Sequence, residues 1–532
     1  MVGKSKNRPR NPGPVALLFT RRTIRYVAGG LSGVLLFACL PSLNLHFLVW
    51  VACFPLLLAT VSEDQLKHAF FQGHVCGAVF WAGSCYWFIA VMRRYGGVNP
   101  LLGTGALILF LAVFAIFFSA LSVVIAWTAR RSIVVALALT PFLWVSMELG
   151  RTHLLFSFPW NLLGYAVQAA GLRQIASVTG VYGLSFLAVL ASAVLAWVFV
   201  QKPLKRALVV SGCLTVAFVG GDFLLSPPPL QQGKSVALLV QPNVPLDEAA
   251  LESWVPWRDP SRLMHLITLS ESGLKSVGPG TDAPPLIIWA ENPAPFYYTR
   301  DPVFRAAIEG LARKAHAYVV FNTITFTGQD NTQPKNSAVV LDPEGRETLQ
   351  YDKIHLVPFG EYVPNWPLLN LAGKITSQVG DFVPGSNYQG ARTMEGAVGV
   401  FICYEAIFPQ LVRRLTPGGP SVLVTISNDA WYGDSSAAYQ HLNMARLRAV
   451  ENGRYLLRAT NDGVTAVIDP FGRIVSELPR HETATLPAHF DYRSKRTFYN
   501  LYGDVFAWLC VAVSIALLAW AARLTTGAGE NL

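Results

Sequence analysis

Long apolar segments joined by short loops constrain this chain more than any other feature. Only 14% of its 532 residues are charged, whereas soluble domains carry about 25%, so much of the chain is expected to lie in lipid. A helix needs roughly 20 apolar residues to cross a bilayer. Segments near that length predict about eight membrane spans: residues 24–40, 45–61, 71–92, 102–128, 132–150, 178–200, 207–225 and 501–523.

The positive charges predict how these spans are oriented, because loops rich in Lys and Arg stay in the cytoplasm. Residues 1–23 are basic and show no convincing small-residue cleavage site, so we expect an uncleaved cytoplasmic tail. Loops with Lys67, Arg130 and Lys202 fall on the same side. Residues 226–500 are then placed outside the cytoplasm. The net charge of +10 is therefore read as orienting a membrane protein, and it does not indicate a nucleic-acid partner.

Residues 226–500 differ in composition from the apolar regions on either side. They begin with a stiff Ser-Pro-Pro-Pro linker, and short β-branched runs then alternate with amphipathic stretches. This alternation predicts an α/β sandwich in which helices cover the sheet faces. We expect a membrane domain over 24–225, the α/β domain, and a last span with a cytoplasmic tail over 501–532. The expected strands are 236–243, 285–290, 318–324, 336–341, 347–351, 397–402, 421–427 and 464–468, with helices at 262–274, 304–316 and 437–452.

Cys403 ends the apolar, β-branched run 398–402, and helix-forming residues 406–415 follow. This pattern predicts a buried strand, a tight turn that carries the thiol, and a helix. A thiol there would stand exposed above the sheet, near a helix N-terminus that favours the thiolate. The alternative is a buried, inert cysteine. No Cys-x-x-Cys pair occurs, so neither a disulfide framework nor a zinc site is indicated.

Two further groups could complete a catalytic site around this thiol. Glu291 follows an apolar run, and Lys353 lies in the segment Tyr-Asp-Lys-Ile-His-Leu-Val-Pro-Phe-Gly-Glu. Groups at the carboxyl ends of neighbouring strands can converge in one crevice. There the carboxylate would move protons, the ammonium would stabilise a developing oxyanion, and Cys403 would form a thioester. Taken singly, Glu291 could equally be a solvated loop residue or a cap, and Lys353 a surface lysine.

The order Glu, Lys, Cys and the residues around each resemble the nitrilase, or carbon–nitrogen hydrolase, superfamily. The specific blocks are residues 353–364, Cys403-Tyr404-Glu405, and residues 427–434 with Gln440-His441 after them. Together with the flanking spans, they make the chain similar to the membrane-integrated apolipoprotein N-acyltransferase family. The resemblance implies a nitrilase-like αββα sandwich domain inserted between polytopic transmembrane helices.

The same resemblance assigns residue roles. Glu291 would be the general base, Lys353 the oxyanion-stabilising residue and Cys403 the nucleophile. Glu361 matches a second acidic residue that supports the site, and the alternative is an ion-pair partner of Lys353 without a proton role. Tyr404 and Glu405 would shape the pocket or hold a lipid head group; core packing and a carboxylate in the first turn of the helix are their alternatives. A family tryptophan would correspond to Trp254 or Trp257, and His355 is expected to be a hydrogen-bonding core residue.

The resemblance further implies the substrates and the location. A membrane phospholipid would donate an acyl chain to a diacylated apolipoprotein, at the periplasmic side of a bacterial inner membrane, without a metal or nucleotide cofactor. Residues 359–371 are expected to dip into the outer leaflet, or else to belong to the domain core. The aromatic loop 154–161 is expected to be an interfacial element or a plain anchoring loop.

Two other classes of protein stay open on the sequence. The first is a membrane-tethered amidase or nitrilase, in which water replaces the amine acceptor. Eight spans would be many for a tether. The second is a transporter or channel with a soluble binding domain. The spans carry few charges, and no chain of acidic residues crosses their middle as proton-coupled transport would require.

Overall fold

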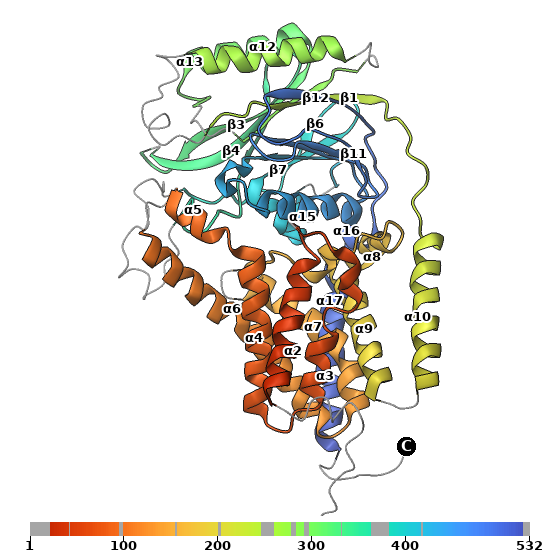
Figure 1. Cartoon of the computed structure of the whole chain (residues 1–532). Coiled ribbons are helices and arrows are strands. Elements are labelled where there is room, and N and C mark those ends of the chain that lie inside the picture. The colour runs from red at the N-terminus through yellow and green to blue at the C-terminus, as the bar shows by residue number, and fades with distance from the viewer. Residues whose placement is uncertain are drawn as a thin grey trace, which may run out of the picture.

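The computed structural model has helices at one end and a two-sheet α/β part at the other (Figure 1). It describes residues 22–524, except 42, 95–98, 155–156, 201–203, 246–259, 278–282, 292–296, 331, 363–381 and 416–418. In chain order the α/β elements stand between helices α10 and α17, and α17 runs back down beside the helices of the N-terminal half.

Four helices in the described part of the chain are long and apolar enough to cross a membrane: α6 (Pro100–Ala129), α7 (Ile133–His153), α9 (Val181–Val200) and α17 (Val505–Arg523). The other predicted spans fall on shorter or less apolar elements. The expected span 45–61 is divided into a 3₁₀ turn and a short helix, because α3 restarts at a proline in its first turn. These elements are α2 (Arg22–Ala38), η1 (His46–Trp50), α3 (Phe54–Val61), α4 (Leu66–Cys85), α5 (Phe88–Arg94) and α10 (Leu204–Leu224).

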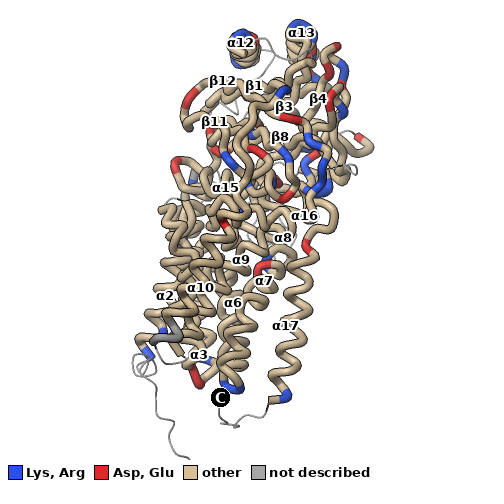
Figure 2. Tube along the Cα trace, turned by 90° about the vertical axis from the view of Figure 1, so that its right-hand side faces the viewer, with Lys and Arg blue, Asp and Glu red and all other residues tan. Residues whose placement is uncertain are grey.

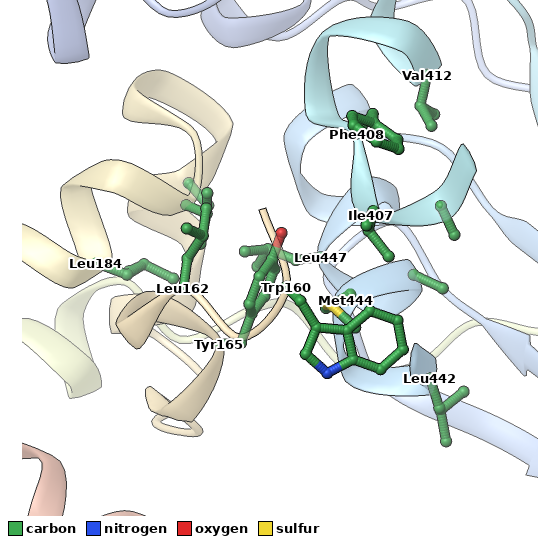
Figure 3. Packing of buried hydrophobic residues seen from close by; sticks show 14 of the residues in the cluster. Trp160, Leu162, Tyr165, Leu184, Ile407, Phe408, Val412, Leu442, Met444 and Leu447 are labelled. Atoms are coloured by element: carbon green, nitrogen blue, oxygen red, sulfur yellow. The ribbon is translucent and has the colours of Figure 1, made fainter. Parts of the chain in front are cut away.

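The second half of the aromatic loop after α7, from Phe158 to Asn161, packs inside the protein, whereas Leu154 at its start is exposed. Trp160 is 1% exposed and lies against helix α15 (Ala437–Asn452) of the α/β part. Figure 3 shows Trp160, Leu162 and Tyr165 facing Ile407, Met444 and Leu447. The short elements η2 (Leu163–Ala166), η3 (Leu172–Ile175) and α8 (Ala176–Thr179) complete this layer. The hydrophobic core therefore continues from the membrane-type helices into the α/β part.

Two six-stranded sheets form the α/β part. In the first, of order β12-β1-β2-β3-β4-β5, strands β1, β2 and β3 are parallel and the outer pairs antiparallel. In the second, of order β11-β10-β9-β8-β7-β6, strands β7, β8 and β9 are parallel. The strands are β1 (Ser235–Gln241), β2 (Leu286–Trp289), β3 (Tyr318–Thr327), β4 (Gln333–Leu341), β5 (Glu347–Asp352), β6 (Ala391–Arg392), β7 (Ala397–Ile402), β8 (Val422–Ser427), β9 (Leu456–Thr460), β10 (Ala466–Ile468), β11 (Ile474–Glu477) and β12 (Ala484–Phe490).

Helices cover the outer face of each sheet, as the alternating pattern predicted. Helices α12 (Ser261–Ser276) and α13 (Pro302–Ala315) lie over the first sheet, and their apolar faces form a separate core with it. Asp301 caps α13 by accepting from the N–H groups of Val303 and Phe304. Helices α14 (Pro409–Arg414) and α15 lie between the second sheet and the membrane-type helices, with α16 (Phe498–Tyr502) beside them. Sheet on sheet between helices is the expected αββα sandwich.

Candidate active site

Cys403 sits at a sharp turn directly after β7. Its backbone φ of +48° is a left-handed conformation that residues other than glycine rarely adopt. The 3₁₀ turn η4 (Cys403–Ile407) follows, and α14 begins only at Pro409. The predicted strand and turn are therefore confirmed, but one continuous helix over 406–415 is wrong because Pro409 starts a new helix.

The thiol is not exposed as expected: Cys403 is 6% exposed. Burial, reinforced by the carboxylate of Glu291, raises the pKa of the Cys403 thiol, and the charge of Lys353 only partly opposes this effect. The raised pKa favours the thiol over the thiolate, so a base would have to remove its proton before the sulfur could act as a nucleophile.

Glu291 and Lys353 meet beside this turn. Glu291 lies two residues after β2, and Lys353 directly follows β5. Lys353 Nζ is 3.6 Å from Glu291 Oε1. The two strands are not neighbours, and Cys403 follows a strand of the other sheet. The expectation of neighbouring strands is thus wrong: the three groups converge between two facing sheets, which screens them from water on both sides.

Asn336, which the sequence pattern gave no reason to select, holds the two carboxylates together. Its Nδ2 donates to Glu291 Oε1 at 2.9 Å and to Glu361 Oε1 at 2.8 Å. Asn322 Nδ2 donates in turn to Asn336 Oδ1 at 2.7 Å, which fixes the orientation of the amide. The backbone N–H of Asn428 donates to the second oxygen of Glu291 at 3.1 Å. Glu291 is therefore held on both oxygens.

Glu361 is an ion-pair partner of Lys353. Its Oε1 lies 2.9 Å from Lys353 Nζ, and its Oε2 accepts from the N–H of Val357 at 2.8 Å. Burial disfavours the charge on Lys353, but the carboxylates of Glu361 and Glu291 outweigh it and raise the pKa of this lysine. The ammonium is thus kept in a water-poor site, where it can stabilise negative charge.

Glu405 ties the lysine segment to the cysteine turn. Its Oε1 accepts from Tyr351 Oη at 2.9 Å and from the backbone N–H groups of Ile354 and His355 at 2.7 and 3.2 Å. Its Oε2 accepts from the N–H of Ile402 at 2.7 Å. Its side chain is 0% exposed and lies in the first turn of η4, where all its hydrogen bonds are to the protein itself.

The rings near the turn pack on one another. Tyr404 is buried and its ring lies edge-on to Phe408. The His355 ring also packs on Phe408: the two rings are stacked, with their centroids 4.2 Å apart. Tyr404 packs in the core, as one of its two interpretations had it, whereas the half-buried His355 is seen to stack on Phe408 and its expected side-chain hydrogen bond stays a prediction.

A buried network of polar side chains lies behind Cys403. His441 on α15 contacts the carbonyl oxygen of Cys403 through Nε2 at 3.0 Å and Asp429 Oδ1 through Nδ1 at 2.9 Å. Asp429 also accepts from Ser427 Oγ at 2.8 Å and from Arg458 Nη2 at 2.5 Å. All four side chains are fully buried.

Some expected site residues fall on parts of the chain that the structure does not describe. Trp254 and Trp257 lie in 246–259, and most of the predicted leaflet loop lies in 363–381. Of that loop, Phe359 is described: its φ is +63° and its N–H donates to the carbonyl of Tyr362 at 2.8 Å. Among the residues described, no three His, Cys, Asp or Glu side chains gather as a metal site would need.

Sequence comparisons agree with this geometry. Residues 257–497 match the model of the carbon–nitrogen hydrolase family, and residues 32–194 match the N-terminal domain of apolipoprotein N-acyltransferases. The chain is 37% identical to an apolipoprotein N-acyltransferase of Geobacter metallireducens, over 94% of this chain and 95% of the relative. The chain belongs to the apolipoprotein N-acyltransferase family. Related enzymes of Methylococcus capsulatus and Bradyrhizobium diazoefficiens are 33% and 34% identical, over 87% and 74% of this chain and the same shares of each relative.

Family membership explains why a carbon–nitrogen hydrolase sandwich and apolar helices occur in one chain. The family's two parts match separate stretches of this sequence, and the site described above lies wholly within the second stretch. The first stretch nevertheless contacts the second, since Trp160 in the loop after α7 stacks on the ring of His441 with centroids 6.1 Å apart.

Proposed function

We propose that the protein transfers an acyl chain from a membrane phospholipid to the N-terminal diacylglyceryl-cysteine of a lipoprotein, by a ping-pong reaction through a thioester on Cys403. The observation that carries this proposal is the meeting of Glu291, Lys353 and Cys403 in a buried site packed directly on apolar helices. A soluble hydrolase of the same superfamily would need the three groups but not the helices.

The first half-reaction moves the acyl group onto sulfur. Glu291 takes the Cys403 proton as the sulfur attacks the ester carbonyl of the phospholipid, and Lys353 stabilises the oxyanion of the tetrahedral intermediate. The carbon–oxygen bond then breaks, Glu291 returns the proton to the departing alkoxide, and a lysophospholipid leaves. A base next to the thiol is needed because burial keeps the sulfur protonated at rest.

The second half-reaction moves the acyl group onto nitrogen. The α-amine of the diacylated cysteine attacks the thioester carbonyl, Glu291 takes a proton from the nitrogen, and the carbon–sulfur bond breaks. The sulfur leaves as a thiolate and recovers its proton from Glu291. An amide replaces a thioester, which is a more reactive acyl derivative, so this step runs downhill. Both steps use the same base and the same oxyanion site, which fits a single set of buried groups.

The proposed arrangement in the membrane follows from the substrates. Two acyl chains hold each substrate in the bilayer, since each buried methylene contributes about 0.8 kcal/mol, so the site must lie at the membrane surface. We propose about eight spans within residues 24–225 and 501–532, with the catalytic domain, residues 226–500, on the periplasmic side of the inner membrane. Figure 2 shows few charged residues along the helices, with charges gathered at their lower ends and in the α/β part. The family resemblance points to the sn-1 chain as the group transferred.

The decisive experiment is mass spectrometry of the purified protein incubated with phospholipid alone. An acyl adduct should appear on the peptide that contains Cys403, and a diacylated lipopeptide added afterwards should remove it as the N-acylated product. The proposal is wrong if no adduct forms or if Cys403→Ala keeps its turnover. Ammonia release from small amides, without acyl transfer to the lipopeptide, would instead identify a membrane-anchored amidase.

A further inference from the structure

The last two turns of α7 carry a glutamate and an arginine that are buried among apolar helices. Glu148 is 1% exposed and Arg151 is 3% exposed. Both belong to a helix that is long and apolar enough to cross a membrane, where a charged side chain is costly and needs a partner of its own. Neither residue contacts the candidate active site, so their burial requires a separate explanation.

These two charged groups form no ion pair with each other. Glu148 Oε2 and Arg151 Nε and Nη1 are buried and have no hydrogen-bond partner among the described residues. The guanidinium carbon lies 4.8 Å from the centre of the Trp81 ring, which offers its N–H groups no lone-pair acceptor. Glu63, the only other glutamate in residues 24–225, shows the contrast, because its carboxylate meets Arg25 Nη1 at 2.8 Å. Since a buried charge without a partner is strongly destabilising, Glu148 and Arg151 require a partner that they share.

Both side chains line one small cavity, together with Asn161. Asn161 follows Trp160 in the loop after α7. It is 2% exposed, and its Nδ2 also has no hydrogen-bond partner among the described residues. The rest of the wall is mostly apolar and comes largely from α2, α4, α6 and α7. The cavity offers about 10 Å³ to the centre of a water molecule, which is close to what one water needs and too little for a lipid head group.

The polar atoms around this cavity select its occupant. Arg151 and Asn161 offer N–H donors, and Glu148 offers the lone pairs of a carboxylate oxygen. A chloride ion would be repelled by the carboxylate, and a metal cation would be repelled by the guanidinium. Water both donates and accepts, and a buried water typically makes about three hydrogen bonds to such groups. One water that donates to Glu148 and accepts from Arg151 and Asn161 gives each of the three residues a partner.

We propose that this cavity is a binding site for one structural water, which bridges Glu148 to Arg151 and Asn161 and holds the loop after α7 in place. Direct bonds already join this loop to α7 at two points: Glu148 Oε1 accepts from the N–H of Leu163 at 2.8 Å, and the carbonyl of Arg151 accepts from the N–H of Phe158 at 3.2 Å. The water adds a third link between these two points, through Asn161.

The position of the loop matters because its next residue meets the α/β part. Trp160 donates to Gln440 on α15 at 2.8 Å, and Figure 3 shows it facing Met444 on the same helix. The water-bridged cluster therefore fixes the surface of the membrane part on which the α/β part packs. This inference does not depend on the reaction that the protein catalyses.

Hydroxyl-radical labelling by X-ray pulses tests for the water, because radicals formed from a bound water oxidise the side chains beside it. Phe118 and Phe114 are a matched pair on α6: both are 3% exposed, but Phe118 lines the cavity and Phe114 does not. In the full-length protein in nanodiscs, we expect Phe118 to be oxidised severalfold faster than Phe114. Equal rates for the two phenylalanines would show that the cavity is dry and would overturn the proposal.

Two variants test which side chains hold the water. Glu148→Gln keeps an acceptor for the N–H groups of Leu163 and Trp144 but turns an NH₂ group toward the cavity, so that only donors face the water. Oxidation of Phe118 should then fall severalfold, and the thermal unfolding midpoint should drop. Arg151→Met should also lower both, and the double variant should lower the midpoint by less than the sum of the single effects, because each variant removes the same bridge.

Glu63→Gln is the control, because it weakens a direct ion pair that does not line the cavity. It should lower the unfolding midpoint and leave the oxidation of Phe118 unchanged. The proposal is overturned if Glu148→Gln leaves Phe118 oxidation at the wild-type rate, or if the midpoint shifts of Glu148→Gln and Arg151→Met simply add. None of these measurements uses a substrate, so a failure of the proposed acyl transfer would not alter them.

Discussion

Replacing Asn336 with aspartate should stop the acylation of Cys403. In the structure Asn336 Nδ2 lies 2.9 Å from Glu291 and 2.8 Å from Glu361. A carboxylate oxygen in its place would repel each neighbour by about 6 kcal/mol at that distance with an effective dielectric constant near 20. Lys353 offsets part of this repulsion, and the rest forces at least one carboxyl group to bind a proton. Because Glu291 is the proposed base, we expect acylation to slow at least about 100-fold.

The control for this prediction is Asn336→Ala, which removes both hydrogen bonds without adding charge. It should slow acylation less than the aspartate does, by roughly ten- to a hundredfold, since two hydrogen bonds to charged groups are lost. Single-turnover transfer from a fluorescent phospholipid onto the enzyme measures both variants, with circular dichroism as a check of folding. The reasoning is refuted if the aspartate variant is acylated as fast as the alanine variant or faster.

Three further predictions concern the groups around the site. Glu405→Ala leaves four donors, two of them buried and two partly buried, without their acceptor. It should therefore destabilise the protein by about 3–5 kcal/mol. A thermal unfolding midpoint close to that of the wild type, with acylation intact, would contradict this. The raised pKa of Cys403 means that its thiolate fraction grows with pH, so iodoacetamide should react about tenfold faster per pH unit from 6 to 8, and a plateau in that range would falsify it. Trp160→Ala should cost about 3–5 kcal/mol because the side chain is buried at the junction, whereas Trp520→Ala, at a half-exposed position, should melt like the wild type.

Four of the correctly predicted strands are apolar at almost every position. β1, β2, β7 and β8 are buried on both faces, so a continuous β-branched run is visible without any knowledge of the partners. Strand β9 was not predicted because Arg458 interrupts its short run, and that arginine is tolerated inside only because Asp429 pairs with it. β12 was missed for a similar reason, since a proline and polar residues alternate along this edge strand.

In the candidate site, too, residues with a recognisable local sequence could be predicted, whereas residues whose role depends on distant partners could not. Lys353 and Cys403 could be selected because each lies in a specific sequence block, and Glu291 because it follows an apolar run and stands first in the order Glu, Lys, Cys. Asn336 could not, because its function depends on a partner 45 residues earlier in the chain and another 25 residues later. The wrong expectation of an exposed thiol has a related cause: the facing sheet that buries Cys403 is invisible in its local sequence.

Adjacent residues on helix α15 connect the site to the membrane part. Gln440 accepts from Trp160 Nε1 at 2.8 Å and donates to the backbone carbonyls of Pro41, after α2, and of Ser84, in the last turn of α4. His441, the next residue, donates to the carbonyl of Cys403. Trp160 contacts both of them. A simple tether would leave such a helix free to be solvated, but here residues of the membrane part pack against α15 behind Cys403, the proposed nucleophile. A hydrolase domain cut away from the helices would expose His441 to water and lose the ring that covers it. The membrane part thus supports the proposed site directly, which favours an acyltransferase acting at the bilayer over an amidase that is merely anchored there.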